Sequence, residues 1–471
     1  MMNLKSVRKR FTASALLAAV GGALASCTVG PNYQRPDLKV PAAYQRSAAP
    51  EATPSAEIGN RWWTLFGDPV LTKVADDTVA ANLDIRAAMA RVDQARESRR
   101  AALGNFAPDL NLGASSRRSG NANGVSNQFS LPLTLNYEID VWGRLRRQYE
   151  VYKNSEAASV ADLEFVRQSA VAEVVQAYFT IRLSDRQVAL LEEALQLYRK
   201  QLELTDTKYK AGLALPTDLL QAKTQVNSAT NQLIDVRRSR AKQEHAIALL
   251  LGRAPSDYSF TRANPALVLP AVPAGLPVNL LARRPDVAES EYRLAAANAQ
   301  IGLAKANFFP SFTLSSSAGF QSANLSNLLD WEKRVWSFGP SLSLPIFQGG
   351  RLTAALAQAK ARYEEVMANY RTSVLAALRD VEDQLSELQL LAEKAKSLEE
   401  TLVSAREYSR LTELQYKQGL TTYLQVIDAN QTLLNNELSA AQAESQRLTA
   451  TVLLIKALGG GWQNPAAPVS K

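Results

Sequence analysis

Four short segments of the chain alternate apolar and polar residues with a period of two. Apolar side chains occupy even positions in residues 108–117, 311–321 and 335–346, and odd positions in residues 127–139. This alternation predicts strands with one apolar and one polar face. It suits both a transmembrane barrel and a soluble sheet with one buried face, and the pattern alone favours neither.

Two long stretches, residues 144–211 and 351–418, contain neither glycine nor proline. A helix of this length reaches roughly 100 Å, far beyond a typical globular helix. We therefore expect extended helical packing in both stretches. Shorter helices are expected from about Asp84 to Asn105 and from about Asp286 to Asn307, where Pro285 suits a first helical turn.

The ends of the two long helices carry the same turn residues. Gly212 and Gly419 stand where a left-handed cap residue belongs. Pro216 lies near the start of the helix after the first turn, and Thr422 and Gln425 offer a capping box after the second. The sequence thus predicts two hairpins of long helices.

Several motifs occur twice, which indicates a tandem duplication. "NFAPDLNL" at 105–112 returns as "NFFPSFTL" at 307–314. "GRL" at 143 returns at 350, and "YKAGL" at 209 returns as "YKQGL" at 416, and these two motifs share one slightly longer displacement. The predicted organisation is a signal segment at 1–26, an anchor and linker at 27–60, a first repeat at 61–270, a second repeat at 271–459 and a tail at 460–471.

Each repeat supplies two strands, and four strands are too few to close a barrel. Because an open edge is not tolerated in lipid, membrane insertion requires several copies of the chain. Two copies enclose little more than their own side chains, whereas three copies leave a passage. A trimer is therefore the smallest assembly that conducts. Pro132 and Pro340 do not fit regular central strands, and we expect local bulges there.

Residues 1–27 have the parts of an export signal, because a basic segment precedes the uncharged run from Phe11 to Ser26. This run is shorter than the roughly 20 residues that a membrane-spanning helix needs. The simpler interpretation is a cleaved signal with an incidental cysteine. However, "LASC" at 24–27 resembles the lipobox of bacterial lipoproteins, which implies a diacylglycerol and an N-acyl chain on Cys27. Thr28 follows instead of the aspartate associated with inner-membrane retention, and this implies sorting to the outer membrane.

Composition narrows the functional classes. The chain is 46% hydrophobic and 21% charged, which is typical of an ordered protein. One cysteine excludes an intrachain disulfide, and one histidine leaves few ligands for a metal site. The formal charge of +8 comes partly from the signal segment, and the remaining charges alternate in sign. We expect no enzyme, no cofactor beyond the covalent lipid, no metal site and no nucleic-acid binding.

The chain resembles an outer membrane factor of the TolC type, in the lipoprotein branch (the NodT family) that serves RND-type multidrug efflux pumps. The resemblance covers nearly the whole chain and depends on the following motifs: "LASC" with "VGPNYQRP", "WWTLFGDPVL" at 62–71, "LPVNLLARRPDVAESE" at 276–291, "FFPS" at 308–311, "FGPSLSLPIFQGGRL" at 338–352, "YKQGLTTYLQVIDAN" at 416–430 and "ALGGGW" at 457–462.

This resemblance implies an α+β fold dominated by long helical hairpins. Three chains would form a twelve-stranded transmembrane barrel, a periplasmic tunnel of helices and a mixed equatorial domain. The homotrimer would be a passive exit duct in the bacterial outer membrane, with an iris-like periplasmic gate. Its partners would be a periplasmic adaptor (a membrane fusion protein), an inner-membrane RND-type pump and outer-membrane lipid.

The resemblance also implies site residues near the helical turns. Mapped onto this chain, the constricting apolar residue is Leu424, the gate carboxylate is Asp428, the gate tyrosine is Tyr416 and the tethering acid is Asp218. The chain departs from the pattern at three positions, because Gln431 replaces a basic residue, Gln425 replaces a second acid, and Thr421 replaces an arginine. Three copies of Asp428 would form a weak cation ring. The expected adaptor contacts are Gly212, Leu213, Gly419 and Leu420.

One alternative stays open beside the duct. A lipid-anchored periplasmic coiled-coil scaffold or adhesin would use the same helices without a pore. The substrates are also open, and they include drugs, metal ions and small metabolites, because the pump selects the cargo. The cognate pump, the cognate adaptor and the resting state of the gate are not specified by the residues.

Overall fold

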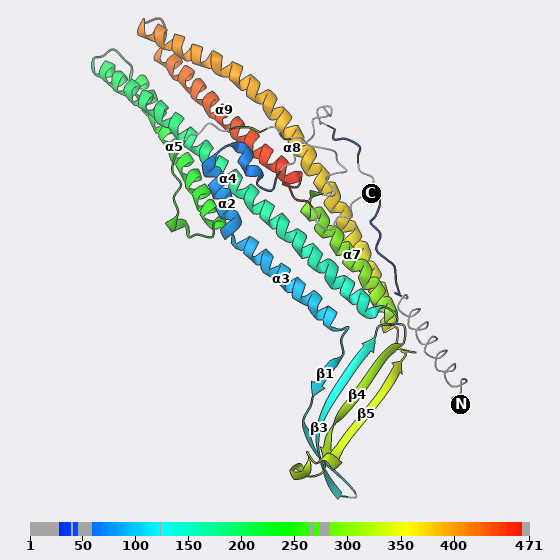
Figure 1. Ribbon diagram of the computed structural model, residues 1–471. Coiled ribbons are helices and arrows are strands. Elements are labelled where there is room, and N and C mark those ends of the chain that lie inside the picture. Colours follow the sequence, from blue (N-terminus) through cyan, green and yellow to red (C-terminus); the bar gives the residue numbers. More distant parts are fainter. Residues whose placement is uncertain are drawn as a thin grey trace. The chain divides into compact units, whose positions relative to one another are not determined.

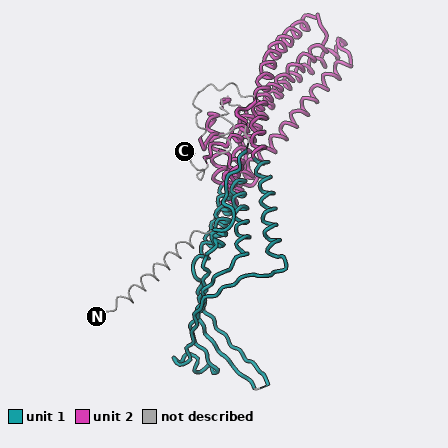
Figure 2. Tube along the Cα trace, turned by 90° about the vertical axis from the view of Figure 1, so that its right-hand side faces the viewer, with its two compact units in different colours: residues 1–38, 90–160, 289–373 teal, residues 39–89, 161–288, 374–471 magenta. Residues whose placement is uncertain are grey.

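The computed structural model describes residues 28–38, 41–45, 59–122, 124–263, 268–270, 272 and 283–463 (Figure 1). The predicted signal segment, Cys27, and most of the predicted linker and tail lie outside these described residues. The chain divides into two compact units (Figure 2). Unit 1 comprises residues 1–38, 90–160 and 289–373, and unit 2 comprises residues 39–89, 161–288 and 374–471. Each unit draws on both predicted repeats.

The boundaries of the helices repeat with the displacements of the sequence motifs. The shorter displacement, that of "NFAPDLNL", relates α3 (Leu83–Gly104) to α7 (Pro285–Ala306). The longer displacement, that of "YKAGL", relates α4 (Arg144–Lys210) to α8 (Arg351–Lys417), and α5 (Pro216–Leu250) to α9 (Tyr423–Ala457). The tandem repeat and the long helices are thus present in the structure as predicted.

The main core of unit 2 lies where α4, α5 and α9 meet a short N-terminal segment. This segment consists of η1 (Trp62–Phe66) and α2 (Pro69–Ala81), and a further short helix, η2 (Pro255–Asp257), follows α5. Trp62 and Trp63 are buried, and Phe66 packs edge-on against Phe179 of α4 at 5.1 Å between ring centroids. The aromatic residues of "WWTLF" therefore anchor the segment to the helices.

Unit 1 contains one antiparallel sheet. Its strands are β1 (Asp109–Leu112), β2 (Ser115–Asn121), β3 (Gly124–Ile139), β4 (Ser311–Ser322) and β5 (Arg334–Ser343), with η3 (Leu325–Asn327) and η4 (Trp331–Lys333) before β5. The order is β1–β3–β4–β5, and β2 also pairs with β3. β1 and β2 keep one register along β3, so they are a single predicted strand interrupted at Gly113 and Ala114. Figure 1 shows this sheet extending from the ends of α3 and α7.

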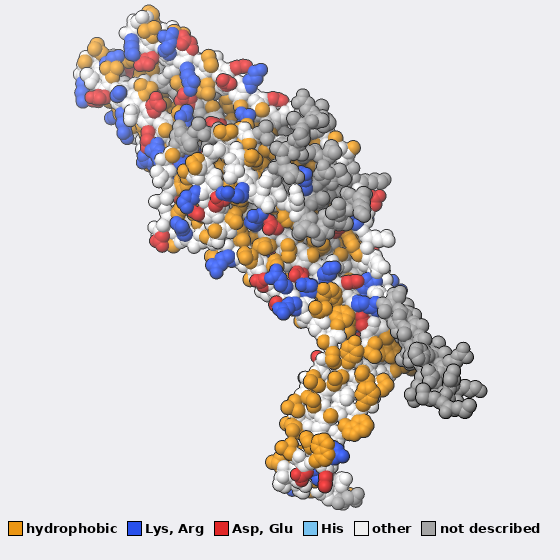
Figure 3. Space-filling view, in the orientation of Figure 1, with side chains coloured by type: hydrophobic (Ala, Val, Ile, Leu, Met, Phe, Trp, Pro, Cys, Tyr) orange, Lys and Arg blue, Asp and Glu red, His pale blue; other side chains and the backbone are white. Residues whose placement is uncertain are grey.

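The register places the alternating residues as predicted. Leu131 of β3 pairs with Phe320 of β4, and Phe312 of β4 pairs with Leu342 of β5. One face of the sheet is therefore mainly apolar along β1, β3, β4 and β5, whereas serine, threonine and asparagine line much of the other. Many apolar side chains of this face are exposed in the single chain, among them Trp336 at 79%. Figure 3 shows hydrophobic side chains gathered over the strands.

The predicted bulges at Pro132 and Pro340 are wrong. The β3–β4 and β4–β5 registers run without an inserted residue through both prolines. The carbonyl of Pro132 accepts a hydrogen bond from the Gly113 N–H at 2.9 Å, so its ring nitrogen faces the interruption between β1 and β2. Gly319, which lies opposite, lets the two backbones approach, because an added Cβ would lie 2.1 Å from the Leu131 carbonyl oxygen. The N–H that Pro132 lacks would have faced β1 and β2, so its absence removes no hydrogen bond between β3 and β4.

The segment that follows Cys27 is bound along unit 1. The Val29 N–H donates to the Trp142 carbonyl at 3.0 Å. Arg147 of α4 is 2% exposed and donates to the carbonyls of Val29 and Gly30, both at 3.2 Å, and to Asn32 Oδ1 at 2.8 Å. The chain just after the predicted lipid site is thus fixed beside the junction of β3 and α4.

Candidate functional site

The two helical turns of unit 2 have the same cap geometry. Gly212 and Gly419 adopt left-handed backbone angles, with φ of 72° and 76°. The Leu213 N–H donates to the Lys208 carbonyl at 2.8 Å, and the Leu420 N–H donates to the Gln415 carbonyl at 2.9 Å. These six-to-one bonds are Schellman motifs, and they end α4 and α8 as the sequence predicts.

The helices that leave the turns begin differently from each other. α5 starts with Pro216 as predicted, and the Asp218 carboxylate accepts a hydrogen bond from the Leu215 N–H at 3.2 Å. Within one chain Asp218 thus satisfies its own helix start, and its predicted role as a tether to another helix remains a prediction. Thr422 precedes α9, but its side chain makes no capping hydrogen bond, so the predicted capping box with Gln425 is wrong.

Tyr416 joins the ends of the two long helices. The Lys208 ammonium of α4 donates to the Tyr416 hydroxyl at 2.9 Å and lies 4.5 Å from its ring centroid. The ring of Tyr416 also lies 5.7 Å from that of Tyr423 at the start of α9. The predicted gate tyrosine therefore sits between α4, α8 and α9, and its lysine partner is a residue that the sequence reasoning missed.

Tyr423 is a second residue that the sequence reasoning missed. It is 8% exposed and packs against Ala222 of α5 and Val426 of its own helix. Burial raises the pKa of its hydroxyl, which a hydrogen bond to Thr205 of α4 partly offsets. The only hint in the sequence is its position one residue after the helix cap. Tyr423 binds the first turn of α9 to both α4 and α5.

Leu424, Gln425 and Asp428 lie on the exposed side of the first turns of α9. Leu424 is 57% exposed, and Asp428 is one helical turn further along on the same face. The Tyr408 hydroxyl of α8 lies 3.5 Å from the Asp428 carboxylate. The structure thus brings the predicted apolar residue and the predicted carboxylate together on one unobstructed surface of the chain.

The two other positions that depart from the family pattern, Gln431 and Thr421, are partly buried. Gln431 accepts a hydrogen bond from the Gln225 amide of α5 at 2.5 Å and donates to Asn435 at 3.2 Å. It therefore ties α9 to α5 with a neutral pair. The Thr421 hydroxyl is buried and has no hydrogen-bond partner in the described part of the chain.

Exposed leucines cover the turns. Leu213 is 78% exposed and Leu420 is 73% exposed, whereas the adjoining Gly212 and Gly419 have open space around their Cα atoms. The four residues predicted to contact an adaptor are therefore accessible at the ends of both hairpins (Figure 1).

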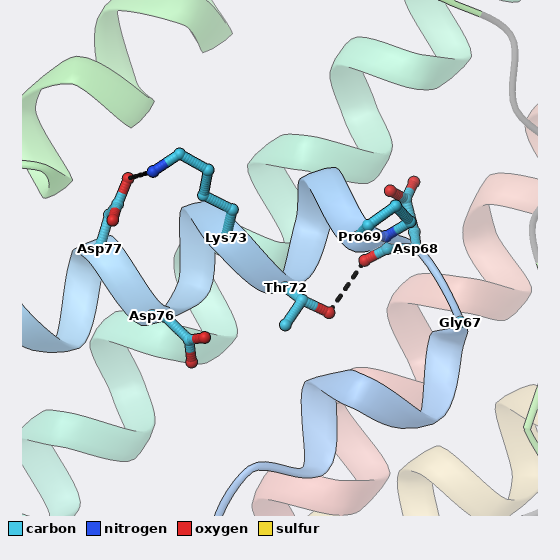
Figure 4. A pocket seen from close by; sticks show the side chains of 7 residues that line it. All are labelled: Gly67, Asp68, Pro69, Thr72, Lys73, Asp76 and Asp77. Atoms are coloured by element: carbon cyan, nitrogen blue, oxygen red, sulfur yellow. Dashed lines mark hydrogen bonds and ion pairs between the residues drawn. The ribbon is translucent and has the colours of Figure 1, made fainter.

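A shallow depression near the start of α2 holds no free polar group that points to a ligand (Figure 4). Asp68 caps α2 by accepting from the Val70 and Leu71 N–H groups at 2.8 and 3.2 Å. Lys73 pairs with Asp77 at 3.0 Å, and Asp76 accepts from the Trp63 indole at 3.1 Å. The polar side chains here stabilise the local fold.

The described residues also bear on metal binding and on membrane-spanning helices. No cluster of three or more histidine, cysteine or acidic side chains with metal-binding geometry occurs among them. Among the same residues, no helix combines the length and apolarity needed to cross a membrane.

Comparison with known proteins gives a consistent result over the whole length. A sequence model of the family described as outer membrane efflux protein matches residues 74–253 and 276–460. Outer membrane protein OprJ of Pseudomonas aeruginosa is 33% identical over 466 residues, which is 96% of each chain. The cation efflux system protein CusC of Escherichia coli is 30% identical over 446 residues, 94% of this chain and 97% of CusC.

This chain belongs to the outer membrane efflux protein family. The solved structure of the outer-membrane channel OprN is similar to it with a TM-score of 0.85 and 31% identity, covering 93% of this chain and 100% of OprN. The predicted family, the α+β fold dominated by long helices, the outer-membrane location and the function as an efflux component are thereby confirmed. The domain boundaries and the gate and adaptor residues remain predictions.

Proposed function

We propose that three copies of this chain form the passive exit duct of a tripartite efflux pump, and that the chain itself catalyses no reaction. The observation that supports this most directly is the sheet of unit 1. It has two open edges and an exposed apolar face, which suit a wall that closes only with further copies in lipid. Membership of the outer membrane efflux protein family is consistent with this function.

The ends of the helical hairpins are the proposed contact with a periplasmic adaptor and, through it, an inner-membrane RND-type pump. Leu213 and Leu420 are the most exposed leucines there, so their apolar side chains are available to an adaptor. The neighbouring glycines keep the turns sharp.

The proposed gate is the exposed face of α9 that carries Leu424 and Asp428. In a trimer, three leucines would narrow the axis and three carboxylates would attract cations. Tyr416 and Gln431 connect α8 and α9 to the first hairpin, through Lys208 of α4 and Gln225 of α5. Opening would require these contacts between neighbouring helices to change.

The lipid on Cys27 is the proposed anchor. Several acyl chains hold a protein firmly, because each buried methylene contributes about 0.8 kcal/mol. The binding of residues 29–32 by Arg147 would keep the anchor close to the start of the helices. Cys27→Ser should abolish acylation, measured by mass spectrometry, and leave trimer formation largely intact. A variant that stays monomeric after refolding in detergent would contradict a purely anchoring role.

Conductance in a planar bilayer tests the duct. Purified protein should give small, discrete, cation-favouring steps. Asp428→Ala should enlarge the steps and weaken the cation preference, because the carboxylate and its contact with Tyr408 are both lost. The matched control is Asp235→Ala, which removes an exposed acid on α5 that pairs with Arg238. A flat trace under conditions where a known duct conducts would favour the scaffold or adhesin without a pore.

A further inference from the structure

The sheet of unit 1 has two edges within the described chain. One edge is β5, and the other is the interrupted strand formed by β1 and β2. β5 pairs with β4 alone, while β1 and β2 pair with β3 alone. In the proposed function these edges meet the edges of neighbouring copies. The pairing inferred below rests on that function, and it identifies the residues of neighbouring copies that lie opposite each other at these edges.

The tandem repeat relates the two hairpins of the sheet to each other. In the first hairpin Asp109 of β1 pairs with Asn136 of β3. The shorter displacement of the repeat relates Asp109 to Ser311, and the longer displacement relates Asn136 to Ser343. Ser311 and Ser343 also pair. Ser115 pairs with Ser130, and the same displacements lead to Ser317 and Ser337, which again pair. The two hairpins therefore have identical registers, and the helix displacements hold for the strands.

The junction between β3 and β4 has an equivalent that one chain cannot form. It joins the second strand of the first repeat to the first strand of the second repeat. Its equivalent joins β5, the last strand of the second repeat, to β1 and β2 of the next copy. β5 and β1 run in opposite directions, so this junction is antiparallel like the others.

We infer that β5 pairs with β2 of a neighbouring copy in the register of the β3–β4 junction. Thr134 of β3 pairs with Ser317 of β4. In the equivalent junction, the longer displacement replaces Thr134 by Ser341 of β5, and the shorter displacement replaces Ser317 by Ser115 of the next copy. Ser341 should therefore lie opposite Ser115. Ser130 pairs with Gln321, and its equivalent is Ser337 opposite Ser119.

Three features of the chain agree with this register. It sets even positions against even positions, so that the apolar face continues from Leu342 and Leu344 to Ala114 and to Leu112 of β1. It also places Leu344, just beyond β5, opposite Leu112, which would extend the strand by residues that have no partner on β4.

The polar face supplies the third feature. Ser341 lies 2.6 Å from the Thr313 hydroxyl and Ser115 lies 2.7 Å from the Ser130 hydroxyl. Bringing Ser341 and Ser115 together joins these two hydroxyl pairs into a belt around the polar side. The pairs Ser317–Ser337, at 2.8 Å, and Ser119–Ser126, at 3.1 Å, would be joined in the same way.

The hydrogen-bond phase of the junction follows from Pro132. Its carbonyl points to Gly113, so even residues of β3 face β1 and β2. Backbone N–H and C=O groups alternate in direction along an antiparallel ladder. In the odd residues of β5 and β2 these groups therefore point away from the junction between copies. Ser341–Ser115 and Ser337–Ser119 are therefore non-hydrogen-bonded pairs, whose Cα atoms lie about 4.5 Å apart. This distance is within the range of a disulfide.

Disulfide trapping tests the register, and Cys27 is the only native cysteine. We expect Ser115→Cys combined with Ser341→Cys to give a covalent trimer after mild oxidation in membranes, and Ser119→Cys with Ser337→Cys to do the same. The matched offset variant is Arg117→Cys with Ser341→Cys, in which the Cα atoms would lie about 8 Å apart, beyond the reach of a disulfide. Each single variant should stay uncrosslinked.

An internal control separates failure of the register from failure of the assembly. Thr134→Cys with Ser317→Cys copies the junction within one chain and should form an intrachain disulfide. If the offset variant gives the covalent trimer and the two matched variants do not, the register is wrong while the trimer stands. If only the internal control oxidises and the native mass is that of a monomer, both the register and the proposed function are wrong.

Discussion

At the scale of single residues, the backbone conformation of Gly419, and not close packing within the chain, favours glycine. Its φ of 76° is left-handed, yet an added Cβ would meet no atom within 4 Å. Gly419→Ala should therefore cost about 1–2 kcal/mol, the strain of an L residue in this region. Thermal unfolding of the purified protein measures the loss.

Gly104→Ala is the matched control for this prediction. Gly104 also has open space around its Cα atom, but its φ is not positive and it ends α3. We expect no loss of stability, or a gain of up to about 1 kcal/mol from reduced backbone freedom. Equal effects of the two substitutions would show that the left-handed angle at Gly419 is not the cause.

Lys456 gives the stability of unit 2 a pH dependence. Burial, followed by the nearby Arg284 guanidinium, lowers the pKa of Lys456 below its usual 10.5. The unfolded chain therefore binds the ammonium proton more tightly than the folded chain does. The charged Lys456 lowers the free energy of unfolding at neutral pH, and this loss disappears as the pH rises through the lowered pKa toward 10.5. Lys456→Met should raise the free energy of unfolding at neutral pH, and the gain over the unsubstituted protein should shrink at higher pH.

Guanidinium unfolding followed by circular dichroism at several pH values checks this prediction. Lys394→Met is the control, because Lys394 is exposed on α8. This substitution measures the effect of removing an ammonium group from the surface of the chain. A difference for Lys456→Met that stays constant across the same pH range would mean that the folded and unfolded states bind this proton equally.

At the scale of elements, the bound N-terminal segment depends on Arg147. This guanidinium makes three hydrogen bonds to residues 29–32, and a hydrogen bond to a charged group contributes about 1.5–3 kcal/mol. Arg147→Met should release the segment, so that hydrogen exchange at the Val29 N–H accelerates about tenfold or more. Arg100→Met, which removes only an exposed pair with Glu97, should leave that exchange unchanged. Unchanged exchange in Arg147→Met would contradict the role of Arg147.

The elements also show where sequence reasoning succeeds. The long helices were predictable because their boundaries coincide with glycines and prolines that act locally, such as Gly212 and Pro216. The faces of the strands were predictable because alternation is a local pattern. The glycine after the long helix and the alternation along the strands both recur in the second repeat, which strengthens these two predictions.

Contacts between distant residues were not predictable. Lys208 meets Tyr416 and Gln225 meets Gln431 although each pair joins one repeat to the other, and no local pattern reports such pairs. The proline interpretation failed for the same reason. Whether Pro132 disrupts a ladder depends on which strand its nitrogen faces, and this is decided by the interruption at Gly113.

At the scale of the whole molecule, the exposed apolar face must be covered in the functional state. β4 has 12 residues, so it is about 40 Å long, and tilted by about 40° it spans about 30 Å, the thickness of a hydrocarbon core. Phe338 and Leu342 of β5 are 65% and 62% exposed, and with Trp336 they belong to a run of exposed apolar residues on one face of the strand. Lipid is the partner that matches this length and polarity.

Tryptophan fluorescence distinguishes lipid from water at this face. Trp336 is 79% exposed on the apolar face of β5, whereas Trp62 is 2% exposed in the core of unit 2. In vesicles whose acyl chains carry bromine, contact with lipid should quench Trp336. Trp336→Phe should therefore reduce the quenchable fluorescence, while Trp62→Phe, a matched loss of one indole, should leave it intact. If bromine quenches the unsubstituted protein and Trp336→Phe equally, this face of the sheet does not contact the bilayer interior.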